Sequence, residues 1–249
     1  MLRLMLRLVP RRHRFSAALV CARLLTPVIS RTAYCRSRRK SIVDSPLEIS
    51  LYLILAGLTR EGISYEPCLH ITGFDLFEAE VKAGRGVLLI SGHNVFGFAI
   101  LNYLAERGYK ASLVSYTPDP HRLLAPGVPT EVIAPNRSYL LQIRNRFRNG
   151  EVVGAMIDRS EAVGDRTFPV ATAGGTVHLA DALIEVATHA KAGIIFLRAS
   201  VEEGAIEIEL TRPRLPEGDA KSDIKSDAKS IARDFAQFLQ SHILRNTSR

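Results

Sequence analysis

Short apolar runs alternate with helical patterns along most of the chain, and this alternation constrains the fold more than any other feature. The runs GVLLIS (86–91), VVGAMI (152–157) and GIIFLRA (193–199) are continuous and apolar. Strands that are buried on both faces of a parallel sheet have this character. Stretches of helical period stand between the runs, at 96–108 and 138–150. The sequence therefore predicts an α/β domain with a central, mostly parallel sheet flanked by helices.

The remaining elements follow the same two patterns. Further strands are predicted at 111–115, 130–134 and 205–210, and further helices at 45–60, 74–83, 176–193 and 221–244. Ser45 and Pro46 favour a helix start, because serine caps helices and proline suits the first helical position. Gly108 and Gly150 follow the helical stretches as stop signals. No linker divides this part of the chain, so we expect residues 45–249 to form a single domain.

The net charge of +8 comes from the N-terminal segment. Residues 1–40 contain eleven of the 33 lysines and arginines and no acidic residue. The rest of the chain contains the other 22 basic residues and all 25 acidic ones, so its net charge is −3. A nucleic-acid-binding domain usually spreads basic residues over a folded face, so we expect no nucleic-acid partner. The alternative is a protein whose basic arm binds nucleic acid, and the acidic body argues against it. We interpret residues 1–44 as a basic membrane-surface segment and connector.

The first thirty residues combine arginine with leucine at helical spacing. Arg3, Arg7, Arg11 and Arg14 recur every three or four residues, among apolar side chains. A basic amphipathic helix of this kind suits the surface of an anionic bilayer. Three other interpretations remain open: a secretory signal, an organellar transit peptide, or a helix that packs on the core with a solvated face. No apolar run reaches the length of a membrane-spanning helix, so any membrane attachment would be peripheral or monotopic.

Several kinds of site are not expected. The three cysteines show no spacing typical of a zinc site or a disulfide framework, and we predict no metal and no cofactor. The chain has no GxSxG elbow, no Walker loop, and no GxGxxG after a strand.

Two predicted strands end in polar clusters. GVLLIS is followed by Gly92-His93-Asn94, and VVGAMI by Asp158-Arg159-Ser160. In an open α/β sheet the ligand crevice lies beyond the carboxyl ends of the strands. If the two strands are parallel and close, His93 meets Asp158 there. A histidine oriented by a carboxylate can deprotonate a hydroxyl or an amine, so His93 is the candidate base and Asp158 its candidate partner. The alternative is that His93 is a hydrogen-bonded packing residue.

Three segments together resemble a known family. The stretches KAGRGVLLISGHNVFGFAILNYLAERGYKASLVS, RNGEVVGAMIDRS and IEVATHAKAGIIFLRA resemble the lysophospholipid acyltransferase superfamily. The closer branch contains the lipid A late acyltransferases and the mycobacterial phosphatidylinositol mannoside acyltransferase. The resemblance covers roughly residues 70–200. It implies an acyltransferase-like fold on the cytoplasmic face of a bacterial inner membrane.

The resemblance also implies partners and site residues. The donor would be an acyl carrier protein or an acyl-CoA, the acceptor a lipid-like hydroxyl or amine, and His93 the general base. Asn94 is a candidate donor to the oxyanion, and Arg159 with Asn136 and Arg137 could hold a phosphate or the phosphopantetheine arm. The apolar face of helix 96–108, with Phe96, Phe98, Ile100, Leu101 and Leu104, could line an acyl groove or pack in the core.

One departure from the family pattern affects the expected activity. The family motif places an aspartate or glutamate five positions after the histidine, and Phe98 stands there instead. Asp158 could supply the missing carboxylate, or His93 could act alone as a poorer base. A third interpretation is a catalytically silent relative that binds a lipid or an acyl carrier.

Overall fold

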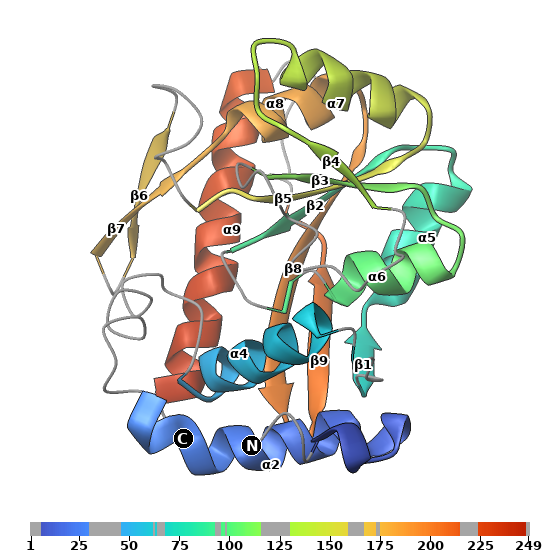
Figure 1. Cartoon of the computed structure of the whole chain (residues 1–249). Coiled ribbons are helices and arrows are strands. Elements are labelled where there is room, and N and C mark those ends of the chain that lie inside the picture. The colour runs from blue at the N-terminus through green and yellow to red at the C-terminus, as the bar shows by residue number, and fades with distance from the viewer. Residues whose placement is uncertain are drawn as a thin grey trace.

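A seven-stranded, mostly parallel sheet forms the centre of the protein in its computed structural model (Figure 1). The structure describes residues 6–29, 46–61, 63, 68–92, 96, 97, 99–115, 130–158, 167–172, 175–214 and 224–247. The strand order is β1-β9-β8-β2-β5-β3-β4. The five strands from β8 to β4 run parallel, and β9 and β1 run in the opposite direction. The predicted α/β class with a mostly parallel sheet is confirmed.

The central strands come from the apolar runs. The seven strands of the sheet are β1 (Leu69–Thr72), β2 (Val87–Ser91), β3 (Ala111–Val114), β4 (Glu131–Ile133), β5 (Val152–Met156), β8 (Gly193–Glu202) and β9 (Ala205–Thr211). Every residue of β2 is buried, and so are four of the five residues of β5. Both faces of these strands are therefore covered, which explains why their sequences lack an alternating pattern.

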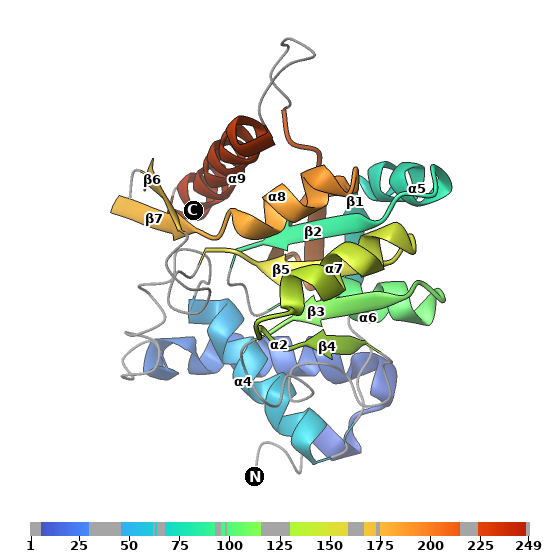
Figure 2. The ribbon, with the colours of Figure 1, turned by 90° about the horizontal axis from the view of Figure 1, so that it is seen from above.

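Helices cover the two faces of the sheet in two layers (Figure 2). One layer contains α2 (Arg14–Ile29), α4 (Pro46–Arg60), α5 (Phe74–Lys82) and α6 (Ala99–Glu106). The other contains α7 (Tyr139–Arg148), α8 (Ala182–His189) and α9 (Ile224–Thr247). Gly150, with a φ of 72°, follows α7 as predicted, because a left-handed residue ends a helix readily when it has no Cβ.

The first helices cross the lower end of β8 and β9 in Figure 1. A 3₁₀ turn, η1 (Arg11–His13), leads into α2, which packs along α4. Phe15, Leu19 and Leu58 join the core that the sheet shares with these helices. Glu48 is buried at the start of α4, and its Oε1 accepts a hydrogen bond from the backbone N–H of Val201 at 3.1 Å. This hydrogen bond therefore links the start of α4 to the end of β8, the longest described strand.

No helix within the described ranges is long and apolar enough to span a bilayer. The outer face of α2 nevertheless exposes large apolar side chains. Val20, Leu24 and Val28 recur every four residues and are 56%, 74% and 65% exposed. Arg23 of the same helix and Arg11 and Arg12 of η1 are also exposed. This segment therefore packs on the body with one face and presents an apolar and basic face outward.

The helix predicted over 176–193 is wrong at its start. Residues Gly175–Leu179 form strand β7, which pairs antiparallel with β6 (Phe168–Thr172) in a separate two-stranded sheet beside α9. The helical part, α8, begins only at Ala182. Leu179 and Leu183 are four residues apart, a spacing that fits both a strand and a helix, so the pattern could not locate the change from strand to helix. Strand β1 and strand β6 were also not predicted.

Candidate functional site

The ends of β2 and β5 lie side by side at the carboxyl edge of the sheet. The two strands are parallel neighbours, with Ser91 paired to Met156 in register. Just beyond this pair the backbone N–H of Ile157 donates to the carbonyl of Ser91 at 3.2 Å. The condition on which the sequence argument depended, that these strands be parallel and close, is therefore confirmed. The polar clusters at 92–94 and 158–160 follow two hydrogen-bonded strands.

The structure describes only part of these clusters. Asp158 is half-buried, two residues beyond the end of β5. His93, Asn94 and Arg159 lie outside the described residues, as does Phe98. The pairing of His93 with Asp158 therefore stays a prediction.

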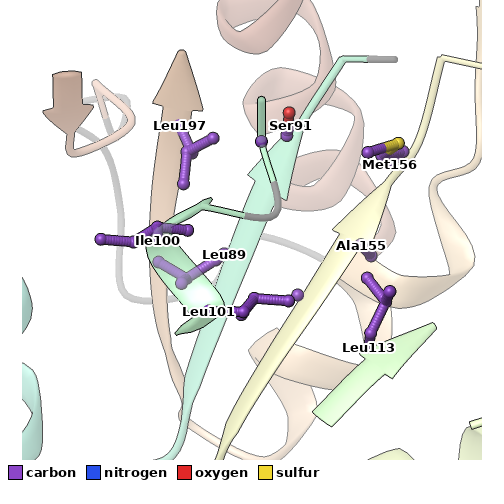
Figure 3. Close-up of a pocket in the computed structure, with 10 residues that line it drawn as sticks. Leu89, Ser91, Ile100, Leu101, Leu113, Ala155, Met156 and Leu197 are labelled. Atoms are coloured by element: carbon purple, nitrogen blue, oxygen red, sulfur yellow. The ribbon is translucent and has the colours of Figure 1, made fainter. Parts of the chain in front are cut away.

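An apolar pocket lies at the same edge, beneath α6 (Figure 3). Its volume is about 270 Å³, including the part open to solvent. The walls come from four neighbouring strands, from α6 and from the turn before α6: Leu89, Ser91, Gly97, Ile100, Leu101, Leu113, Gly154, Ala155, Met156 and Leu197. Ser91 is the only residue in this set with a polar side chain, and its hydroxyl donates to the carbonyl of Gly92 at 2.7 Å. The pocket therefore suits a hydrocarbon group better than a polar one.

Gly154 shapes this pocket by letting α6 approach the sheet closely. A Cβ at this position would stand 3.3 Å from both terminal methyl carbons of Leu101. That separation is tighter than ordinary van der Waals contact, so a larger residue would displace the Leu101 side chain. The Gly154–Leu101 contact thus limits the depth of the pocket on the side of β5 and α6.

The helix that follows His93 in sequence contributes to this pocket only in part. The helix predicted from residue 96 begins only at Ala99, so Phe96 lies in the turn before α6. Ile100 and Leu101 line the pocket, whereas the buried Phe96 and Leu104 do not. The sequence did not predict that the pocket is also lined by Leu89, Leu113, Met156 and Leu197. They share no sequence motif, and they meet only because their strands are neighbours in the sheet.

Asn136 and Arg137 lie farther from the centre of this edge. They follow β4, the outermost strand on this side of the sheet, and both are exposed. At about 4.8 Å between strands, three spacings put the end of β4 about 14 Å from the end of β2. Asn136 also has a local role, because its Oδ1 accepts hydrogen bonds at 2.9 Å from the backbone N–H and the hydroxyl of Ser138. The two residues share the edge with the pocket but do not line it.

Tyr139 is a buried polar residue on the opposite face of the sheet. It begins α7 and packs in the core formed by α7, α8 and α9. Its hydroxyl has no hydrogen-bond partner within the part of the chain that the structure describes. Burial raises the pKa of the tyrosine hydroxyl above its ordinary value.

No group of histidine, cysteine and acidic side chains within the described ranges could hold a metal ion. Comparison of the chain with protein-family models and with curated proteins finds no match. The candidate site is therefore described by its geometry alone: two adjacent strand ends with polar sequences after them, and an apolar pocket between those strands and α6.

Proposed function

We propose that this protein is a membrane-associated acyltransferase that moves an acyl chain from a thioester donor to a hydroxyl or amine of a lipid-like acceptor. The observation that carries the proposal is the apolar pocket at the carboxyl end of β2. Ser91 lines that pocket and stands two residues before His93 in sequence. An acyl chain in the pocket would therefore have its thioester near the proposed base, because two residues of chain span only about 7 Å.

In the proposed reaction, His93 removes the proton of the acceptor hydroxyl while its oxygen attacks the thioester carbonyl carbon. The tetrahedral intermediate collapses as the carbon–sulfur bond breaks, and the thiolate of the donor takes the proton from the imidazolium. Asp158 is the proposed partner of His93, because it follows Met156, the register partner of Ser91. Asn94 is proposed to donate to the oxyanion, and Arg159 to hold a phosphate of the donor. Acyl carrier protein and acyl-CoA both fit this donor chemistry.

The test measures transfer from an acyl thioester to each of several lipid acceptors. Release of the free thiol reports the rate, and mass spectrometry identifies the product. His93→Ala should reduce the rate about a hundred- to ten-thousandfold. His189→Ala is the matched control, because His189 is an exposed histidine at the end of α8, and this variant should keep the wild-type rate. Transfer by His93→Ala at the wild-type rate would refute the mechanism.

The second candidate function is a silent relative that binds a lipid or an acyl carrier. Phe98, at the position where the resembling family has an acid, favours it. This protein would show no transfer above background with any acceptor. It would still bind an acyl chain, and His93→Ala would leave that binding unchanged.

We further propose that the outer face of α2 docks on an anionic membrane, at the cytoplasmic face of a bacterial inner membrane. The support is the exposed stripe of Val20, Leu24 and Val28 beside exposed arginines. Apolar side chains would enter the interface while arginines contact lipid phosphates. Deleting residues 1–30 would be a poor test, because Phe15 and Leu19 belong to the core.

Substitutions on the exposed face avoid that problem. Val20→Ser with Leu24→Ser should release the protein from vesicles that contain anionic lipid. Leu141→Ser is the matched control, since Leu141 is 57% exposed but lies on α7. High salt should weaken binding of the wild type, because salt screens the arginine–phosphate attraction. Equal sedimentation of all variants with vesicles would exclude α2 as the docking face.

A further inference from the structure

A cysteine, a histidine and a glutamate form a chain of contacts at the edge of the sheet, away from the pocket. Cys68 immediately precedes β1, the outermost strand, and His70 lies two residues along the same strand. The Sγ of Cys68 is 3.7 Å from Nε2 of His70. The Nδ1 of His70 is 2.8 Å from Oε1 of Glu207 on β9. The register of the parallel β1–β9 pair sets His70 directly opposite Glu207, so the sheet itself positions the contact.

The glutamate decides which nitrogen of the imidazole faces the thiol as an acceptor. An ionised carboxylate only accepts hydrogen bonds, so Nδ1 of His70 carries the proton and donates it to Glu207. In the neutral ring this leaves a lone pair on Nε2, toward Cys68. A nucleophile beside a base that is itself oriented by a third group is the arrangement that activates thiols and hydroxyls.

The three groups are open to small reagents. Cys68 is exposed, and the side chains of His70 and Glu207 are 62% and 32% exposed. Within the described residues they do not converge on a point that could hold a metal ion. On the same face of the sheet the next charged groups are Glu209 on β9 and its register partner Arg198 on β8, followed by Glu202 near the end of β8.

We propose that Cys68, His70 and Glu207 form a reactive thiol site that is modified by small disulfides. His70 takes the proton of the Cys68 thiol, and the thiolate attacks one sulfur of the disulfide. A new bond forms between Sγ and that sulfur as the original sulfur–sulfur bond breaks. The leaving thiolate takes a proton from the His70 imidazolium. Cys68 ends as a mixed disulfide, and one half of the reagent is released as a thiol.

General thiol chemistry sets the size of the effect. A free thiol, with an ordinary pKa of about 8.5, is about 3% thiolate at pH 7, so full proton transfer to an imidazole raises the thiolate population by at most about thirtyfold. A thiolate that forms more readily is also a weaker nucleophile, and this reduces the gain in reaction rate by about fivefold. We therefore expect a net acceleration of about fivefold at pH 7. It should vanish near pH 10, where thiols ionise without help.

The experiment treats the full-length protein with hydroxyethyl disulfide, which is uncharged, and follows adducts on each cysteine peptide by mass spectrometry. Cys68 should react about fivefold more slowly in His70→Gln than in the wild type at pH 7, and equally fast at pH 10. Glu207→Ala should also slow it. Glu207→Gln should restore most of the rate, because the amide oxygen still accepts from Nδ1. The half-buried Cys21 is the internal reference and should not respond to these substitutions.

A second measurement needs no variant. Cys68 of the folded wild type should react about fivefold faster at pH 7 than Cys68 of the same protein unfolded in urea. An exposed thiol without assistance would react no faster when folded. Equal rates in wild type and His70→Gln at pH 7, or no excess of the folded over the unfolded rate, would overturn the proposal. Neither result depends on acyl transfer.

Discussion

Leu101 limits the depth of the apolar pocket, and changing its size tests whether that pocket holds an acyl chain. Leu101→Ala removes three carbon atoms from the pocket wall. Gly154→Ala adds one carbon to a residue that lines the pocket, 3.3 Å from the methyl groups of Leu101, and so reduces the space. The two substitutions therefore change the same space in opposite directions, and they should move the preferred acyl chain length in opposite directions.

The expected magnitude follows from the burial of methylene groups. Each buried CH₂ contributes about 0.8 kcal/mol, which corresponds to about fourfold in kcat/KM. Leu101→Ala should lengthen the preferred chain by up to about three carbons. Full use of that space would favour the longer thioester by about sixtyfold, but cores relax into cavities, so about tenfold is expected. Gly154→Ala should shorten the preferred chain by about one carbon. The ratio of kcat/KM for the longer thioester to that for the shorter one should then fall by about fourfold.

The assay compares kcat/KM for a series of acyl thioesters that differ by two carbons, in wild type and variants. Leu104→Ala is the matched control, because Leu104 is fully buried in the same helix but lies outside the pocket lining. It should lose a similar stability, about 2–5 kcal/mol, and keep the wild-type chain-length profile. Identical profiles in all four proteins would show that the pocket does not hold the acyl chain.

Three further predictions concern stability, measured as the free energy of unfolding in urea. Tyr139→Phe should be neutral or stabilising by up to about 1 kcal/mol at pH 7, and a clear loss of stability at that pH would contradict this reasoning. Above about pH 10 the wild type should lose stability that the variant keeps, because burial raises the pKa of Tyr139 and the unfolded chain therefore ionises first. Phe235→Ala should cost about 3–5 kcal/mol, since this fully buried ring lies 5.2 Å from that of Phe196, whereas exposed Gln237→Ala should change stability by less than about 0.5 kcal/mol. Glu48→Ala should cost about 1–3 kcal/mol through the lost acceptor for Val201, and Glu48→Gln, which keeps an oxygen there, should recover part of the loss.

The parts of the fold that follow from local pattern were predictable from the sequence. β2 and β5 are buried on both faces, so their apolar runs identify them without reference to any partner. β1 has only four residues, which alternate between half-buried and exposed, and it forms because β9 offers a free edge. The sequence of β7 fits the start of a helix as well as it fits a strand. Such short strands depend on tertiary pairing, which local pattern does not encode.

The candidate site divides in the same way. The strand ends with polar residues were found because a strand and the cluster after it are adjacent in sequence. The pocket walls come from four strands and a helix, and only the order of the strands brings them together. The contact between His70 and Glu207 joins residues 137 positions apart. A shift of one residue in the register of β1 against β9 would abolish it, so no reading of the sequence alone could have found it.

The attachment of α4 to the end of β8 has a consequence for the order of folding. Glu48 and Val201 are separated by 153 positions, and the core that contains α2 and α4 includes residues of β9, which are made well after both helices. At about 5–20 residues per second, the 151 residues from the end of α4 to the end of β9 take about 8–30 s to make. During this interval the core cluster that contains Phe15, Leu19 and Leu58 lacks the residues that β8 and β9 contribute to it. The N-terminal helices can therefore reach their final packing only after β8 and β9 have been made.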